Sequence, residues 1–368
     1  MLNAAQLEKI VALRRRLHAC PERSGHETAT SAAIRAFLEE NTSLAVEDRG
    51  GWLLATHWEG DGLPEIGFRA ELDTIPVEGS DTDARHGCGH DGHAAILCGL
   101  ALLLEGARTA RNVRLIFQPS EETGEGGPRV CAEWPELANL DAVYALHNIP
   151  GFPKGAVLVR RGCFACASCG LVVRVVGRPA HAAYPGDGAN TIELLSALAL
   201  DTPRMIEDIL GGADRLLMRT LIGLRAGGEN FGLSASEGQL CMTLRGHRQA
   251  DIDALVERIR ARTREGCAEQ GMSCAFELRD VFPDTTNDDA VCEAALARFR
   301  AAGLPVRALE EPMRWSEDFG WMLKKAPGMY FGIGSGEDAP GLHTEGYGFD
   351  DGIIPRAVEA LWALARGE

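Results

Sequence analysis

Short apolar runs alternate with longer helix-like stretches along the first part of the chain. Ile66–Arg69, Val113–Gln118 and Ala142–Leu146 are strand-like, and Ala94–Leu104 is an apolar run of helical length. This alternation is typical of an α/β sheet with parallel strands. An acidic residue or a histidine follows each strand-like run. Because ligands bind beyond the carboxyl ends of such strands, we expect a functional site at that edge.

A second pattern starts near Ser168 and predicts a different sheet. In chain order it reads strand, helix, strand, strand, helix, strand: Leu171–Val176, Asn190–Leu210, Leu216–Leu224, Gln239–Leu244, Asp251–Glu269 and Ser273–Leu278. This β-α-β-β-α-β order is that of a ferredoxin-like domain. The second helix is clearly amphipathic, and we expect an aspartate at its N-cap.

The second pattern interrupts the first, which indicates an inserted domain. After it come a strand, Gly328–Ile333, a glycine-rich loop and a last helix, Pro355–Ala365. A chain of 368 residues exceeds the roughly 250–300 residues that one core supports. We predict a catalytic domain of residues 1–167 and 283–368 and an inserted domain of residues 168–282.

Charge and composition exclude some classes of function. The net charge of −16 argues against a nucleic-acid partner, because phosphate binding needs a basic surface. The longest apolar run is well short of the ~18 residues that span a bilayer, and the N-terminus lacks the apolar core of a signal peptide. The odd number of cysteines, eleven, favours reduced thiols. We therefore expect a cytoplasmic protein without a membrane partner.

Residues His86–His93 contain three histidines, a cysteine and an aspartate, spaced by glycines. Imidazole and thiolate groups bind borderline transition metals well, and glycine allows a ligand to approach the backbone closely. The alternative interpretation is a glycine-rich turn that contains histidines by chance. The partners supplied by other parts of the chain favour a metal site.

Two adjacent carboxylates, Glu121 and Glu122, follow the strand-like run that ends at Gln118. Metal-assisted hydrolysis needs one carboxylate as a ligand and a free one that takes a proton from water. Alone, the pair is typical of an acidic surface turn. Beside the His/Cys cluster, it indicates hydrolysis. The single histidines His147 and His343 each have a structural alternative. His181 starts a loop after the first strand of the inserted domain.

Several motifs together resemble a known family over nearly the whole chain. They occur in the family's order: Arg15–Glu22, Arg69–Pro76, His86–His93, Phe117–Glu122, Ala145–Pro150, Gly177–Ala183, Trp315–Phe319 and Gly341–His343. The chain resembles the metal-dependent amidohydrolase branch of the metallo-aminoacylase and carboxypeptidase superfamily. This branch includes hippurate hydrolases, auxin–amino acid conjugate hydrolases and N-acetyl-diaminopimelate deacetylases.

The resemblance implies a mixed-sheet α/β catalytic domain of the zinc-exopeptidase type with an inserted ferredoxin-like lid and dimerisation domain. It implies that Glu121 is the general base and that Asp73 orients a ligand imidazole. His181 would reach the active site of the partner subunit in a homodimer. Two divalent ions, Zn, Mn, Co or Ni, would be bound by five residues: Cys88, His90, Glu122, His147 and His343.

The chain departs from the family pattern at two places. Glu71 stands where the family often has aspartate, and we assign it no metal role. The run Gly227–Ser234 lacks the family's Asn-x-Ile-Pro sequence, although Asn230 can still contact a substrate. Arg245 is either a partner for a substrate carboxylate or a surface arginine.

The resemblance implies hydrolysis of the amide bond of N-acyl amino acids or similar small amides. One alternative is N-acetyl-diaminopimelate deacetylase, which uses the same chemistry on a longer zwitterionic substrate. An alternative of another class is a catalytically silent metal-binding sensor of a small ligand. Glu121 argues against the sensor, because a silent scaffold has no need of a base.

Overall fold

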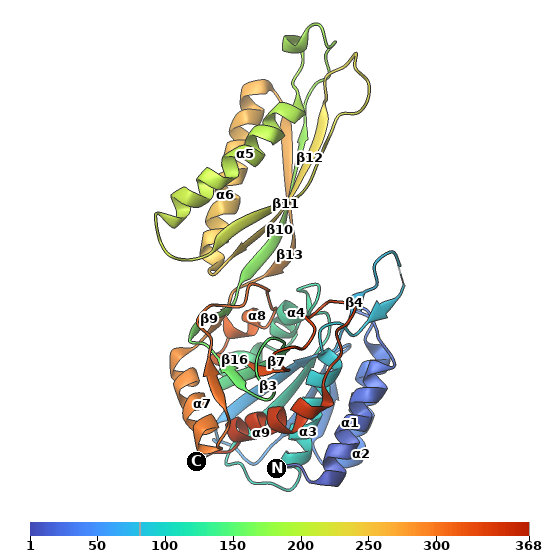
Figure 1. Ribbon diagram of the computed structural model, residues 1–368, viewed down its shortest axis with the longest axis vertical. Coiled ribbons are helices and arrows are strands. Elements are labelled where there is room, and N and C mark those ends of the chain that lie inside the picture. Colours follow the sequence, from blue (N-terminus) through green and yellow to red (C-terminus); the bar gives the residue numbers. More distant parts are fainter. Residues whose placement is uncertain (81, 368) are drawn as a thin grey trace. The chain divides into compact units, whose positions relative to one another are not determined.

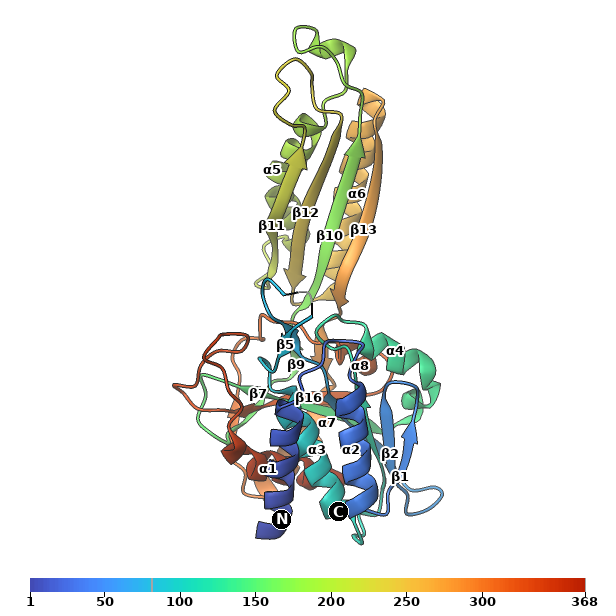
Figure 2. The same ribbon diagram turned by 90° about the vertical axis from the view of Figure 1, so that its right-hand side faces the viewer.

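The computed structural model describes residues 1–80 and 82–367. The chain divides into two compact units (Figures 1 and 2). The first unit consists of Met1–Phe164, Thr285–Pro312 and Asp318–Glu368, and the second of Ala165–Asp284 and Met313–Glu317. No helix within the described ranges combines the length and the apolar composition that crossing a membrane requires.

An eight-stranded mixed sheet forms the centre of the first unit. Its strands, in spatial order, are β1 (Ala45–Asp48), β2 (Leu53–His57), β6 (Asn112–Gln118), β3 (Glu65–Glu71), β7 (Ala142–Ile149), β16 (Gly328–Gly334), β8 (Val157–Val159) and β15 (Val306–Ala308). The four central strands, from β6 to β16, are parallel. The α/β class and the four sequence-predicted strands are confirmed.

Helices pack against this sheet and share its core. Figure 2 shows α1 (Ala4–His18), α3 (His90–Leu104) and α2 (Thr28–Asn41) side by side. The helices α7 (Asp289–Ala301) and α9 (Ile354–Ala365) contribute to the same core. Two short helices, α4 (Gly126–Glu133) and α8 (Gly320–Leu323), pack against each other. The remaining short strands are β4 (Ile75–Pro76), β5 (Ala84–Arg85), β9 (Gly162–Ala165) and β14 (Thr285–Asn287).

The helix α3 begins earlier than the apolar pattern predicts. It starts at His90, and Gly89 at its N-cap has a left-handed φ of 106°. The sequence prediction began at Ala94, because the polar residues before it resemble a loop. Since the helix is buried on nearly all sides, its first turn carries buried polar side chains, including His90 and His93. The candidate ligand His90 is thereby held on a buried helix.

The second unit is an antiparallel four-stranded sheet with two helices. Its elements are β10 (Ala167–Val176), α5 (Thr191–Leu210), β11 (Leu217–Ala226), β12 (Glu237–Gly246), α6 (Gln249–Gln270) and β13 (Ser273–Phe282). The spatial order is β11-β12-β10-β13, and both helices share one core with the sheet. The predicted β-α-β-β-α-β order is confirmed.

The predicted aspartate N-cap of α6 is wrong. The helix begins at Gln249 after Arg248, so Asp251 lies within its first turn. The carboxylate of Asp251 accepts hydrogen bonds of 2.6 and 3.0 Å from the guanidinium of Arg215. The N–H of Gln249, at the start of the helix, donates instead to Oδ1 of Asp284 at 2.9 Å.

Candidate metal centre

The parallel strands bring the candidate residues to one edge of the sheet. In the register of β3 and β6, Glu71 lies opposite Gln118. In the register of β3 and β7, Arg69 lies opposite Ala145, which places Glu71 level with His147. After β6 the chain turns at Ser120, whose φ is 57°, into Glu121 and Glu122. These candidate residues therefore lie at the carboxyl ends of the parallel strands, the edge at which the sequence predicts a site.

The five predicted ligands lie together in the first unit. Ligand atoms of Cys88, His90 and Glu122 are within 4.8 Å of one another. The Nε2 atom of His343 lies 3.4 Å from Oε1 of Glu122. The Nε2 atom of His147 lies 3.3 Å from Sγ of Cys88. Residues from α3, β7 and three loops thus converge on one space.

Asp73 determines which nitrogen of His90 faces this space. The Nδ1 atom of His90 lies 2.9 Å from the backbone oxygen of Asp73 and 3.2 Å from its Oδ1. This leaves Nε2 directed at the carboxylates. Burial lowers the pKa of His90, but Asp73, Glu71 and Glu122 outweigh burial and raise it to about 10. The surroundings therefore favour a positive charge at this point.

Two buried atoms at this point fit a bound cation. Within the described part of the chain, Nε2 of His90 and Oε1 of Glu122 are buried without a hydrogen-bond partner. Buried polar atoms are rarely left in this state, because the loss of water is not compensated. A divalent ion between the two atoms would satisfy both. The thiolate, imidazole and carboxylate groups present are a suitable donor set for such an ion.

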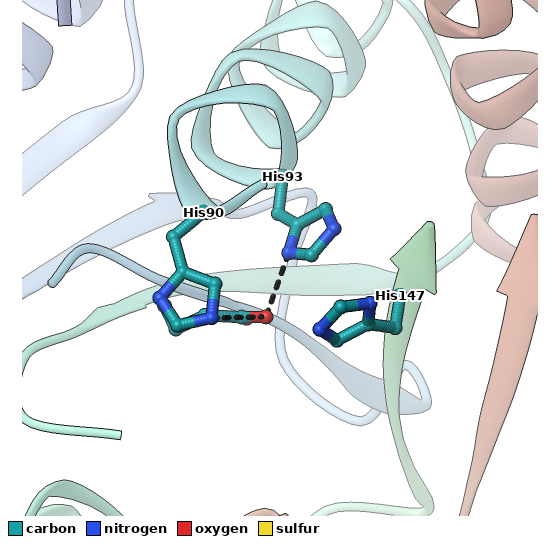
Figure 3. Close-up of side chains that lie close together, drawn as sticks. His90, His93 and His147 are labelled. Carbon is teal, nitrogen blue, oxygen red and sulfur yellow. Dashed lines mark hydrogen bonds and ion pairs between the residues drawn. The ribbon is translucent and has the colours of Figure 1, made fainter. Parts of the chain in front are cut away.

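His147 has the electronic properties of a ligand. Its Nδ1 lies 2.8 Å from the backbone oxygen of Asn148, so Nε2 faces the cluster. Burial, and then the neighbouring His93, hold the pKa of His147 well below its usual value. The ring is therefore neutral, the form that binds metals. Figure 3 shows the rings of His90, His93 and His147 gathered around the same space.

Glu121 is buried beside the same atom of His90. Its Oε2 lies 3.8 Å from Nε2 of His90, as does Oε1 of Glu122. Its Oε1 lies 3.4 Å from the backbone N–H of Asp318, which donates to it. The turn after β6 therefore brings both carboxylates to the site. One is available as a ligand and the other as a base.

A buried network of polar side chains, which the sequence did not predict, lies behind the cluster. The Arg69 guanidinium donates to Oε2 of Glu71 at 2.8 Å and to Asp318 at 2.5 Å. The Nδ1 atom of His93 lies 2.7 Å from Oε1 of Glu71, and its Nε2 lies 2.7 Å from Oδ1 of Asn148. Asp318 lies two residues before α8, which begins at Gly320. Glu71, where the family often has aspartate, was the sequence feature that could have pointed to this network.

His18 forms contacts that link α1 to the segment of the candidate ligands. Its Nδ1 lies 2.8 Å from Oδ2 of the buried Asp91, and its ring stacks on that of His86 at 5.4 Å. Asp91 follows His90 directly on the first turn of α3. His18 therefore ties the end of α1 to the segment that carries two candidate ligands.

The three remaining candidates belong to the second unit. His181 is exposed and forms an isolated bridge with Leu233, so it lies beside the loop of Asn230. Asn230 accepts a hydrogen bond of 3.0 Å from the N–H of Gly232. Arg245 donates to the backbone oxygen of Arg314 and to Ser316. The roles of these three residues stay predictions.

Comparison with known proteins supports the interpretation of the site. Residues 67–367 match the peptidase family M20/M25/M40. The chain belongs to this family. It is therefore a hydrolase of amide bonds, as the sequence motifs predict.

Relatives of the chain in this family include two deacetylases. The N-acetyldiaminopimelate deacetylase of Exiguobacterium sibiricum is 26% identical, over 96% of this chain and 98% of its own. The N-acetyl-L-cysteine deacetylase of Bacillus subtilis is 27% identical, over 99% of this chain and 89% of its own. A solved structure with the same fold is a Bacillus subtilis dinuclear metal-binding peptidase of the M20 family. Its TM-score is 0.81 at 23% identity, over 99% of this chain and 98% of that one.

Proposed function

We propose that this chain is a metal-dependent amidohydrolase that cleaves N-acyl amino acids or similar small amides. The observation that carries the proposal is the cluster of Cys88, His90 and Glu122, with the carboxylate of Glu121 beside the same histidine nitrogen. A ligand set without a base would only bind metal. The additional buried carboxylate supports a hydrolytic reaction.

Five residues would hold two divalent ions: Cys88, His90, Glu122, His147 and His343. A thiolate ligand favours zinc, cobalt or nickel over magnesium or calcium, and the His and Glu ligands also accept manganese. When bound, such ions lower the pKa of water and polarise the substrate carbonyl. The dinuclear peptidase with the same fold supports a stoichiometry of two.

The chain's own residues would move the protons. Glu121 takes a proton from the attacking water and returns it to the leaving nitrogen. His181 donates a hydrogen bond to the carbonyl oxygen as negative charge develops there. Asn230 and Arg245 contact the substrate, and Arg245 pairs with its carboxylate.

His181 would act in the active site of the partner subunit of a homodimer. The exposed side chains of Leu221, Ile222 and Leu224 on the edge strand β11 support an interface through the second unit. Complementation tests the shared site. An E121Q/H181A heterodimer contains one site with both wild-type residues, so random mixing of the two inactive variants restores about a quarter of wild-type activity. Mixtures that stay inactive, although heterodimers form, would contradict the shared site.

The substrate class is tested by metal analysis combined with turnover on a panel of N-acyl amino acids. We expect two ions per chain and hydrolysis of several simple N-acyl amino acids. The named relative supports N-acetyldiaminopimelate as a second candidate. A strong preference for that compound would favour the deacetylase. Bound metal without hydrolysis of any compound would favour a silent sensor.

We further propose a cytoplasmic location. The eleven cysteines all lie in the described residues, and none is joined in a disulfide. This is the state of thiols in a reducing compartment.

A further inference from the structure

We propose that Glu71 is an additional ligand of the metal centre, beyond the five residues named above. This inference rests on the proposed function. Ligand atoms of Glu71, His90, His93 and His147 lie within 4.8 Å of one another, and all four residues are buried. His90 belongs both to this group and to the group of Cys88 and Glu122. Glu71 therefore borders the same space as the expected ligands.

Glu71 is as close to the unpartnered nitrogen of His90 as Glu122 is. The distance from Nε2 of His90 is 3.8 Å to Oε1 of Glu71 and 3.8 Å to Oε1 of Glu122. Ligand bonds to zinc are about 2.0–2.2 Å long, so two ligands of one ion lie roughly 3–3.5 Å apart. A small adjustment would place either carboxylate on an ion held by His90.

The other contacts of Glu71 leave room for coordination. Arg69 donates to Oε2, and the Nδ1 of His93 lies 2.7 Å from Oε1. A carboxylate oxygen has two acceptor sites, so Oε1 can bind an ion and accept a hydrogen bond from His93 at once. His93 is itself engaged at both nitrogens. We infer that His93 positions the carboxylate and that Glu71 is the ligand.

The side-chain length at position 71 determines whether this contact forms. The strand β3 fixes the backbone, with Glu71 paired to Gln118 in the sheet register. An aspartate at the same place would withdraw the carboxylate by about one carbon–carbon bond, roughly 1.5 Å. The aspartate that the family often has would therefore fall short of the ion. This chain would have one more anionic ligand and would hold its metal more tightly.

The test compares wild-type protein with E71D after removal of metal and reconstitution with Co²⁺. Stoichiometry, affinity in competition with a chelator, and the visible absorption of bound Co²⁺ are measured. We expect E71D to bind Co²⁺ at least about 10-fold more weakly. We also expect its absorption to change in intensity, because the band strengthens as the coordination number falls. E65D, at the other end of β3 where Glu65 pairs with Arg114, should match wild type in both measurements.

The outcomes separate this inference from the proposed function. Wild-type protein that binds Co²⁺ with the same affinity and spectrum as E71D overturns the role of Glu71 and leaves the metal centre intact. Wild-type protein that binds no Co²⁺ overturns both. A crystal structure of the wild-type protein with Zn²⁺ tests the contact even if E71D does not fold. We expect an oxygen of Glu71 about 2.0–2.2 Å from the ion. If the oxygens of Glu71 lie too far from the ion to bind it and contact only Arg69 and His93, the inference is overturned.

Discussion

Asp73 and Glu122 are joined by a hydrogen bond of 2.9 Å, in which the backbone N–H of Glu122 donates to Oδ2 of Asp73. The other oxygen, Oδ1, lies 3.2 Å from Nδ1 of His90. One buried carboxylate therefore connects two candidate ligands that are 32 positions apart in the chain. It fixes the orientation of the His90 ring and the path of the turn that carries Glu122.

Replacing this carboxylate should weaken metal binding without unfolding the first unit. In D73N, the new amide offers only one acceptor oxygen, so either the N–H of Glu122 loses its partner or His90 keeps only its contact with the backbone oxygen of Asp73. We expect a 10–100-fold loss of metal affinity, which is about the effect of removing a partner of a metal ligand. Competition with a chelator measures it. S24A is a matched control, because Ser24 also donates to Oδ2 of Asp73 but contacts neither ligand. Equal effects of the two variants would show that the contacts of Asp73 with His90 and Glu122 do not support metal binding.

Gly89 lies between two candidate ligands and should not tolerate a side chain. Its φ is 106°, and an added Cβ would collide with the side chains of Asn148 and Tyr347. Gly106, just past the other end of α3, also has a positive φ, of 66°, but has open space around it. We expect the free energy of unfolding of both G89A and G106A to fall by about 1–2 kcal/mol because of the backbone conformation alone. Only G89A should also lose metal affinity. Equal metal binding by the two variants would contradict this account of the segment.

The contact of His18 with Asp91 should make stability depend on pH. The hydrogen bond to Asp91 raises the pKa of His18 above 6.5, against the opposing effect of burial. A raised pKa in the folded state means that the stabilisation is fully present below 6.5 and is lost as the pH rises through the folded value. Because the His18 side chain is 47% exposed, we expect this contact to contribute less than about 1 kcal/mol to the free energy of unfolding.

Chemical denaturation of metal-free wild-type protein and H18Q measures this contribution. The difference in the free energy of unfolding should be larger at about pH 6 than at about pH 9, where the imidazole is neutral. A difference that grows with pH would have the wrong sign for this ion pair.

The sequence predicted the elements better than their ends. The apolar runs located β3, β6 and β7, because buried parallel strands are nearly continuous in apolar residues. They did not reveal that α3 begins at His90, because a buried polar first turn has the composition of a loop. The aspartate of α6 was misplaced as an N-cap, because its ion pair with Arg215 joins residues 36 positions apart.

Those residues of the candidate site that belong to recognisable motifs could be predicted from the sequence. The five predicted ligands and Glu121 belong to recognisable motifs, and the structure brings them together. Glu71 was set aside because a single substitution does not reveal how far its carboxylate reaches. That depends on the register of β3 with β6 and β7. The contacts of His18 and Asp318 likewise depend on packing between distant segments.

The most direct test of the proposed function is E121Q, measured for both metal content and turnover. Glutamine keeps the shape of the side chain but cannot take a proton, so the ions should stay bound while catalysis is lost. We expect wild-type metal content and a turnover reduced by about 10²–10⁴-fold on N-acyl amino acids. E125Q, an exposed glutamate four residues away, should keep both. Near-normal turnover of E121Q with its metal bound would contradict the assignment of Glu121 as the base.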